Sequence, residues 1–195
     1  MKICITLDDV LRAKTKQFGK IYKKAFPEAK LEEIDLSSGD LKIAFGFETK
    51  EAFNEFLYID YPFEIFGEAP VTEKMLDKKL NLWLIRQADE NPDVSFMLSN
   101  PYEFNASIGY TYFFLSQIAT RIREIYLPSN SKDIWNKCDV LITADKSLLD
   151  NKPEGKISIK IKTDYNTEEK ADYEYDSLDA FLDDEEILKK LQGEN

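Results

Sequence analysis

The sequence predicts an α/β protein, a three-layer Rossmann-like parallel sheet with a small insertion after its first strand–helix unit. Short apolar runs of the length of buried strands alternate with longer segments in which apolar residues recur at helical spacing. Strands that are separated by helices pair in parallel through right-handed crossovers. The segment 31–71 interrupts this alternation and is rich in aromatic residues.

Taken in order, strands are expected at residues 2–7, 94–98, 124–127, 139–143 and 156–162, the last of these completing the sheet. Helices are expected at 11–26, where Pro27 ends the first helix, and at 72–88, 107–121 and 132–137. A single amphipathic helix is expected over 178–191. The tract YIDYPFEIF (58–66) is interpreted as a loop.

We therefore expect one domain with an inserted cap. The core comprises 1–30 and 72–195, and the cap-like insertion comprises 31–71. An acidic C-terminal segment, 164–195, belongs to the core and contains the amphipathic helix.

Composition excludes several classes of protein. With 43% apolar residues the chain can build a core, and its net charge of −11 argues against binding to a nucleic-acid backbone. No apolar run approaches the ~20 residues of a membrane span, and the first residues lack the layout of a secretion signal. We therefore expect a protein that is not secreted. It is expected to be cytoplasmic, or to be assembled into a virus particle in the cytoplasm. Cys4 and Cys138 are interpreted as reduced core residues. The absence of histidine excludes Ser–His and Cys–His catalysis and His-based zinc sites.

The charge is distributed unevenly. Residues 164–195 carry a net charge of −9, whereas residues 12–24 contain six basic residues and no acid. Each run is interpreted as a solvated face or, alternatively, as one of two complementary docking surfaces.

A ligand site is expected where the parallel strands end, because ligands of open α/β sheets bind at the carboxyl ends of the strands. The polar candidates that follow the predicted strands are Thr6, Asp8, Asp9, Ser99, Asn100, Lys132, Thr143 and Asp145.

Four motifs carry a resemblance to a known family over nearly the whole chain. They are TLDDVL (6–11), SFMLS (95–99), SK (131–132) and DVLITAD (139–145). The layout resembles the haloacid dehalogenase (HAD) superfamily, in its deoxyribonucleotidase-like branch, and is similar to degenerate HAD-like proteins encoded by large tailed bacteriophages. The resemblance implies a nucleophilic Asp at the end of the first strand, an acid/base Asp two residues later, a phosphate-holding Ser, a Lys, and an Asp pair that holds magnesium.

The chain departs from this pattern at the positions of the nucleophile and of the metal-binding acids. Thr6 occupies the nucleophile position, and Thr143 and Ala144 occupy the positions of the metal-binding acids, while Asp8, Ser99 and Lys132 match. A threonine without an adjacent base is not activated, and magnesium prefers carboxylate oxygens. We therefore expect no catalytic residue, with Thr6, Asp8, Ser99 and Lys132 as vestigial positions, and no metal site, with Asp8 and Asp145 as weak candidates.

Other interpretations of the matching residues stay open. Asp8 is interpreted as a cap of the first helix, Ser99 as a turn residue and Lys132 as solvated, or Ser99 and Lys132 as remnants of an anion pocket. The acidic cluster 183–186 is interpreted as a solvated helix face.

The leading hypothesis is a non-catalytic, HAD-like structural or binding subunit of a larger assembly, with a bacteriophage virion or tail component as one possibility. The alternative is a magnesium-dependent phosphatase acting on nucleotides or small phosphoesters. Under the leading hypothesis the chain has no cofactor, its partners are other protein subunits in a homo- or hetero-oligomer, and it contacts neither nucleic acid nor a membrane directly. The expected interface residues are Tyr58, Tyr61, Phe63 and Phe66 of the insertion, together with Lys16, Lys20 and Lys23.

Overall fold

The computed structural model describes residues 1–102 and 104–193. Its centre is a six-stranded sheet in the order β3-β2-β1-β4-β5-β6, with every neighbouring pair parallel. The strands are β1 (Lys2–Thr6), β2 (Ser95–Ser99), β3 (Glu124–Tyr126), β4 (Val140–Thr143), β5 (Ile157–Ile161) and β6 (Tyr173–Tyr175). This is the strand order of the Rossmann fold, so the predicted fold class is confirmed.

Helices cover both faces of the sheet. One face packs α4 (Leu76–Glu90), α5 (Asn105–Ile118), α7 (Leu178–Asp183) and α8 (Ile187–Gln192) into a single core, which includes Ile3, Ile5 and Ile142 of the strands. The other face packs the 3₁₀ helix η4 (Ser131–Lys137) and α6 (Lys146–Asp150) against Cys4 and Leu141. Because successive strand residues point to opposite faces, β1 contributes to both cores. Cys4 and Cys138 are buried and free, as expected.

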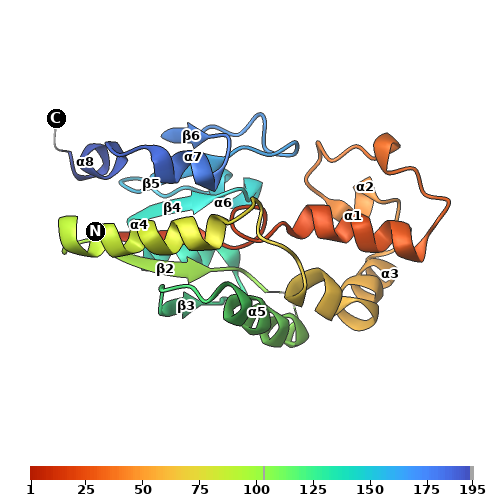
Figure 1. Ribbon diagram of the computed structural model, residues 1–195. Coiled ribbons are helices and arrows are strands. Elements are labelled where there is room, and N and C mark those ends of the chain that lie inside the picture. Colours follow the sequence, from red (N-terminus) through yellow and green to blue (C-terminus); the bar gives the residue numbers. More distant parts are fainter. Residues whose placement is uncertain (103, 194–195) are drawn as a thin grey trace.

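The segment after β1 forms a third packed group beyond the carboxyl ends of the strands (Figure 1). It contains α1 (Lys14–Ala25), η1 (Leu31–Glu33), α2 (Leu41–Ala44), α3 (Lys50–Glu55), η2 (Phe56–Asp60) and η3 (Phe63–Gly67). Phe18 of α1 lies at its centre, 4.7 Å from the ring of Phe45 and 5.4 Å from that of Phe56. Helix α1 thus packs with the inserted segment; the division into a core and a cap-like insertion stays a prediction.

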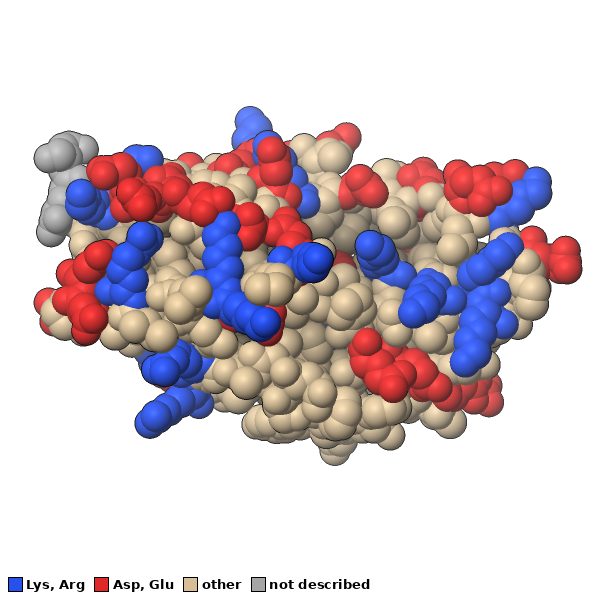
Figure 2. Space-filling view, viewed as in Figure 1, with Lys and Arg blue, Asp and Glu red and all other residues tan. Residues whose placement is uncertain are grey.

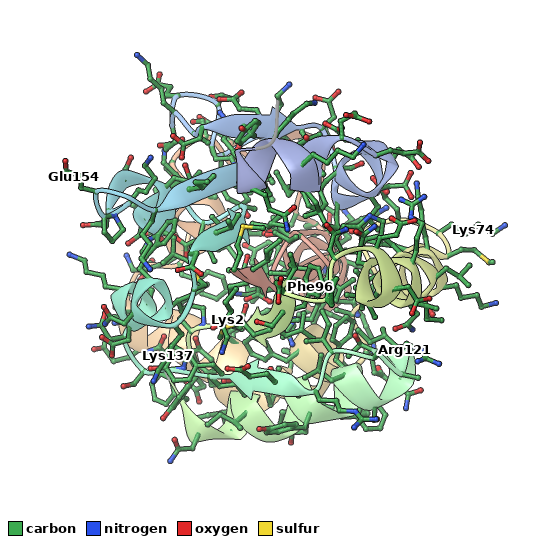
Figure 3. The ribbon with its side chains drawn as sticks, turned by 90° about the vertical axis from the view of Figure 1, so that its left-hand side faces the viewer. Lys2, Lys74, Phe96, Arg121, Lys137 and Glu154 are labelled. Carbon is green, nitrogen blue, oxygen red and sulfur yellow. The ribbon has the colours of Figure 1, made fainter. Side chains whose placement is uncertain are left out.

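The amino ends of the strands lie at the opposite end of the molecule. Figure 3 views this end, with Lys2 and Phe96 near its middle. Lys2 forms an ion pair with Glu124 at 2.8 Å, which links β1 to β3 across β2. No described helix is long and apolar enough to cross a membrane.

The prediction of a loop over 58–66 is wrong. The chain there forms two short π-helical segments, η2 and η3, with hydrogen bonds from Tyr61 N to Phe56 O and from Glu68 N to Phe63 O. Pro62 caps η3, where the missing N–H of proline costs nothing. The wider π turns bring aromatic side chains onto the neighbouring α1 and α5 helices, so tertiary packing decides the local conformation.

Two further expectations at the C-terminal end are wrong. The strand expected at 156–162 is not the last one, because β6 follows it within the acidic segment. Strand β6 is only three residues long, and Glu174 in its middle forms an ion pair with Lys160 of β5 at 3.0 Å. The single C-terminal helix is two helices, α7 and α8. Asp184 separates them because its carboxylate accepts hydrogen bonds from Glu186 N and from the Tyr175 hydroxyl.

Candidate functional site

A cavity of about 860 Å³ lies between the carboxyl ends of the strands and the inserted segment. The ends of β1, β2 and β4 form its floor, and α1, the α2 region and α3 form its opposite wall. The polar residues that line it near the sheet are Thr6, Asp8, Asp9, Lys14, Thr15, Asn100, Asp145 and Tyr165. The site therefore lies where strand order predicts it.

Asp8 is the centre of a charged network at the end of β1. Its Oδ1 accepts hydrogen bonds from Arg12 Nε at 2.8 Å and from Arg12 Nη2 at 2.6 Å. Its Oδ2 lies 3.1 Å from Lys14 Nζ and accepts a hydrogen bond from Asn100 Nδ2 at 3.2 Å. Asn100 Oδ1 also accepts the backbone N–H of Asp8. Both carboxylate oxygens are thus engaged by side chains of this chain.

Arg12 is held rigidly in this network, because its side chain is 0% exposed. Its Nη1 donates to the carbonyl oxygen of Phe66 at 3.0 Å and to Thr111 Oγ1 at 3.1 Å. The guanidinium also lies 5.4 Å from the ring centroids of Phe66 and of Phe114. These contacts hold the buried guanidinium in a single orientation, and the Asp8 carboxylate that binds it is held in place as well.

The electrostatics of Asp8 follow from these neighbours. Burial alone would raise the pKa of the carboxyl group, but the positive charges of Arg12 and Lys14 outweigh it and lower the pKa of Asp8 to about 2. Burial likewise would lower the pKa of Lys14, but the negative charge of Asp8 outweighs that effect and raises it. Around pH 7 the side chains of Asp8 and Lys14 are charged, and Asp8 holds no proton to donate.

Asp9 has a different role from Asp8. Its backbone lies in the left-handed region, with φ of 57°. Its Oδ1 accepts the backbone N–H of Thr15 in the first turn of α1, and its Oδ2 accepts the hydroxyl groups of Thr15 and of Tyr165. Burial raises the pKa of Asp9, and burial together with the Asp9 charge raises that of Tyr165. Asp9 therefore holds the start of α1, and the interpretation of Asp8 as the cap is wrong, because Asp8 turns to Arg12 instead.

The end of β4 contributes hydroxyl groups and one carboxylate. Thr6 Oγ1 donates to Thr143 Oγ1 at 3.1 Å, and Thr143 Oγ1 accepts the backbone N–H of Asp145. Asp145 caps α6 by accepting the N–H of Leu148, and burial raises the pKa of Asp145. Ala144 is fully buried in the main core. A carboxylate at that position would point into apolar side chains and not toward the cavity.

Two of the proposed vestigial residues lie outside the cavity. Ser99 is buried at the end of β2, where its hydroxyl donates to Tyr126 O at 2.6 Å of the neighbouring β3. It is neither a turn residue nor an anion ligand, because the strand pairing uses its hydroxyl. Lys132 is exposed on η4 and does not line the cavity, although Ser131 beside it does. The expected Ser99–Lys132 anion pocket is therefore wrong, while Lys132 as a solvated side chain agrees with the structure.

Residues that the sequence did not single out as site residues complete the network. The interpretation of the basic run as a solvated or docking face is wrong for Arg12 and Lys14, because both form ion pairs with Asp8. The pair of Asp8 and Arg12 forms across a turn that precedes α1, so helical periodicity does not predict it. Nothing in the sequence placed Tyr165 beside Asp9, 156 residues away.

The expected interface residues divide into buried and exposed ones. Phe66 is buried beneath Arg12 and Lys14, so it is not a surface anchor. Tyr58, Tyr61 and Phe63 are half-buried against the aromatic group around α1 and α5. Lys16, Lys20 and Lys23 are exposed and line a second hollow of about 990 Å³, whose apolar wall includes Leu31, Ile34 and Leu36.

A divalent metal ion does not fit this arrangement well. Within residues 1–102 and 104–193, no three Asp, Glu, Cys or His side chains are grouped so that they could hold a metal ion. Of the two weak metal candidates, Asp8 already has both oxygens bonded to cationic or amide groups, and Asp145 accepts the N–H of Leu148 as the cap of α6. We therefore derive no step through a metal.

Neither the family models nor the curated proteins give a match to this sequence. Among solved structures, the chain is similar to one named as a haloacid dehalogenase-like hydrolase from Burkholderia xenovorans LB400, with a TM-score of 0.49 and 10% identity over 95% of this chain and 96% of that chain. This likeness carries no argument about the site, which rests on the side chains described above.

Proposed function

We propose that the chain is a non-catalytic, HAD-like domain that acts as a binding subunit of a larger assembly. The observation that carries this proposal is the engagement of both Asp8 oxygens by Arg12, Lys14 and Asn100. In the motif that the sequence resembles, Asp8 is the acid/base residue, and a general acid or base needs a pKa near the working pH. A carboxyl group with a pKa of about 2 is far from that range.

The position of the nucleophile supports the same conclusion. Thr6 is buried, and its hydroxyl is hydrogen-bonded to Thr143. Hydroxyl nucleophiles are activated by an adjacent general base, and Thr143 is not one. The two positively charged side chains beside Asp8 also supply, from within the chain, the positive charge that a metal ion would bring.

The cavity has a volume of about 860 Å³ and is lined by charged, hydroxyl-bearing and aromatic side chains. A cavity of this size takes a small molecule. Its presence beside a neutralised carboxylate supports binding without turnover. Membership of a virion or tail, and the identity of the other subunits, stay predictions.

Hydrolysis of phosphoesters is the test of the non-catalytic part. The purified chain is assayed with magnesium against a panel of nucleoside monophosphates and an aryl phosphate. We expect turnover below ~0.1 s⁻¹, which is low beside ordinary enzymes. Asp8→Asn is the test variant, and Asp150→Asn is its matched control, because Asp150 lines the same cavity but is exposed.

The two variants separate an enzyme from a contaminant. Turnover that survives both substitutions belongs to another protein in the preparation. Turnover that Asp8→Asn abolishes and Asp150→Asn preserves would overturn the proposal and favour the magnesium-dependent phosphatase. The subunit part is tested by comparing the size of the untagged chain alone with its size in extracts of its native source, where we expect a larger complex.

A further inference from the structure

The exposed side of α5 differs from the rest of the surface. The sequence from Phe104 to Thr120 contains no charged residue, in a chain that carries a net charge of −11. Figure 2 shows an uncharged area where Figure 1 places α5, whereas charged groups are spread over the other elements in view. Phe104, Tyr112 and Phe113 are 40%, 50% and 40% exposed. Exposed aromatic residues on an uncharged face are typical of a contact surface.

Gly109 lies in the middle of this face. It is a helical residue outside the left-handed region, and a Cβ atom there would meet no described atom within 4 Å. Glycine in an exposed helix interior destabilises the helix relative to alanine, and nothing within the chain requires it at this position. A glycine is required where another backbone or a large side chain approaches closely.

Helical spacing arranges the exposed side as a small centre with large flanks. At 100° per residue, Gly109 and Ser116 lie along the middle of the exposed side, and Tyr112 and Phe113 lie on either flank. Two such helices can pack antiparallel about a two-fold axis that crosses their exposed sides at the level of residue 111. Phe113 of each helix then lies opposite Gly109 of the other, and Ala106 lies opposite Ser116. The face is therefore its own complement in shape, as a two-fold interface requires.

We propose that α5 is the contact between two copies of this chain, with Phe113 of each copy seated over Gly109 of the other. Two copies of like charge repel each other, and an uncharged face is where they approach at the lowest electrostatic cost. The neighbouring rings extend the same surface, since Tyr58 lies 4.5 Å from Phe104 and Phe63 lies 5.1 Å from Phe113. This inference rests on the proposed role as a subunit and names one partner.

Sedimentation velocity tests the proposal. A contact of one helix face buries less than a standard-size interface, so we expect the untagged chain to pass from monomer to dimer over roughly 10–100 µM. Gly109→Leu fills the space that Phe113 of the second copy would occupy and should weaken the dimer by at least about tenfold. The same variant should raise the Tm of the monomer, because leucine is the better helix former and a Cβ atom at this position meets no described atom within 4 Å.

Ala88→Leu is the matched control, because it adds the same side chain at an exposed position of another helix, α4. We expect it to leave the monomer–dimer equilibrium unchanged. A chain that stays monomeric throughout this range, or a dimer that Gly109→Leu and Ala88→Leu affect equally, would overturn the proposal. Neither result touches the non-catalytic assignment of the cavity, which the hydrolysis assay tests separately.

Cross-linking tests the register. Ala106→Cys and Ser116→Cys are made separately, both at small exposed positions of α5. Under mild copper-catalysed air oxidation, an equal mixture of the two variants should form a disulfide-linked dimer faster than either variant alone, because Ala106 of one copy faces Ser116 of the other. Equal rates in the mixture and in the separate samples would contradict the antiparallel arrangement.

Discussion

At the scale of single residues, Asp8 links the charge of the site to the stability of the fold. Its carboxylate balances the buried guanidinium of Arg12, which has no exposed surface of its own. When one partner of a buried pair is removed, the other remains as an uncompensated buried charge, which costs about 3–5 kcal/mol. The residue that the motif associates with catalysis therefore serves here to hold Arg12.

The substitution Asp8→Asn should lower the free energy of unfolding by about 3–5 kcal/mol at pH 7, because Arg12 stays buried without its counter-charge. Urea unfolding at pH 7 measures this loss. Asp150→Asn, at an exposed position on the rim of the same cavity, should change it by less than about 0.5 kcal/mol. Similar losses for the two variants would contradict a structural role of the pair.

The pH dependence gives a second measure of the same residue. The folded-state pKa of Asp8 is lowered from 3.8 to about 2, so its contribution is present above the unfolded pKa and is lost as the pH falls toward the folded one. Between about pH 4 and pH 2 the wild type should lose about 2 kcal/mol through this group, and Asp8→Asn should not. Asp9 has a raised pKa and acts in the opposite direction, and the charge of Asp8 is one cause of that raised pKa, so the difference between the two proteins reports Asp8 together with its effect on Asp9. Equal acid sensitivity would show that the pair is not formed in solution.

At the scale of elements, α1 joins the site to the inserted segment. Its first turn is held by Asp9 through Thr15, and its middle carries Phe18 into the aromatic group. Phe26, at the other end of the same helix, is 46% exposed. One helix thus contains a fully buried ring and a half-exposed one, which allows the contribution of packing to be measured.

Phe18→Ala should lower the free energy of unfolding by about 3–5 kcal/mol, because it opens a cavity between several rings. Phe26→Ala, the control on the same helix, should cost about 1 kcal/mol or less, since water already reaches that ring. Chemical denaturation of the two variants checks the difference. A comparable loss in both would mean that the inserted segment does not pack on α1 as described.

At the scale of the whole molecule, the acidic segment reaches from the basic helix to the other end of the molecule. The exposed lysines of α1 lie at one end and the acidic α7–α8 region at the other (Figures 1 and 2), whereas Asp164, at the start of the acidic segment, lines the same hollow as these lysines. The acidic side chains are partly neutralised within the chain: Lys79 pairs with Asp179 and Asp183, and Arg86 pairs with Glu185. The basic end has fewer such partners among the described residues. Its charges are therefore less neutralised and act more strongly on another molecule that approaches.

Replacing Lys16, Lys20 and Lys23 together by Glu changes the net charge from −11 to −17, two charges at each position. The Tm should change little, because these side chains are exposed. Self-association should slow at low ionic strength and return to the rate of the wild type at high salt, where charges are screened over a few ångströms. Stopped-flow light scattering checks this, and a deficit that persists at high salt would place the lysines in the interface itself.

What the sequence determined by itself is the layout of the sheet and the place of the site. The apolar runs ICI (3–5) and VLIT (140–143) are buried on both faces, and a short run of this kind between helical segments predicts a parallel strand wherever it occurs. Because parallel strands end at the same edge, Thr6, Asp8, Asn100 and Asp145 were predicted to be neighbours from their places in the chain alone.

Only the tertiary structure decided which cations reach Asp8, which rings are buried and where the last strand lies. Periodicity reports which face of an element is apolar, but it does not report where a long basic side chain ends. Lys14 therefore lies on Asp8, while Lys132 points to solvent. Phe66 is buried in the aromatic group with Arg12 over its ring, and β6 pairs with β5, where Lys160 and Glu174 form an ion pair. These contacts join residues that are distant in sequence. They can form and stabilise the structure only after folding has brought those residues together.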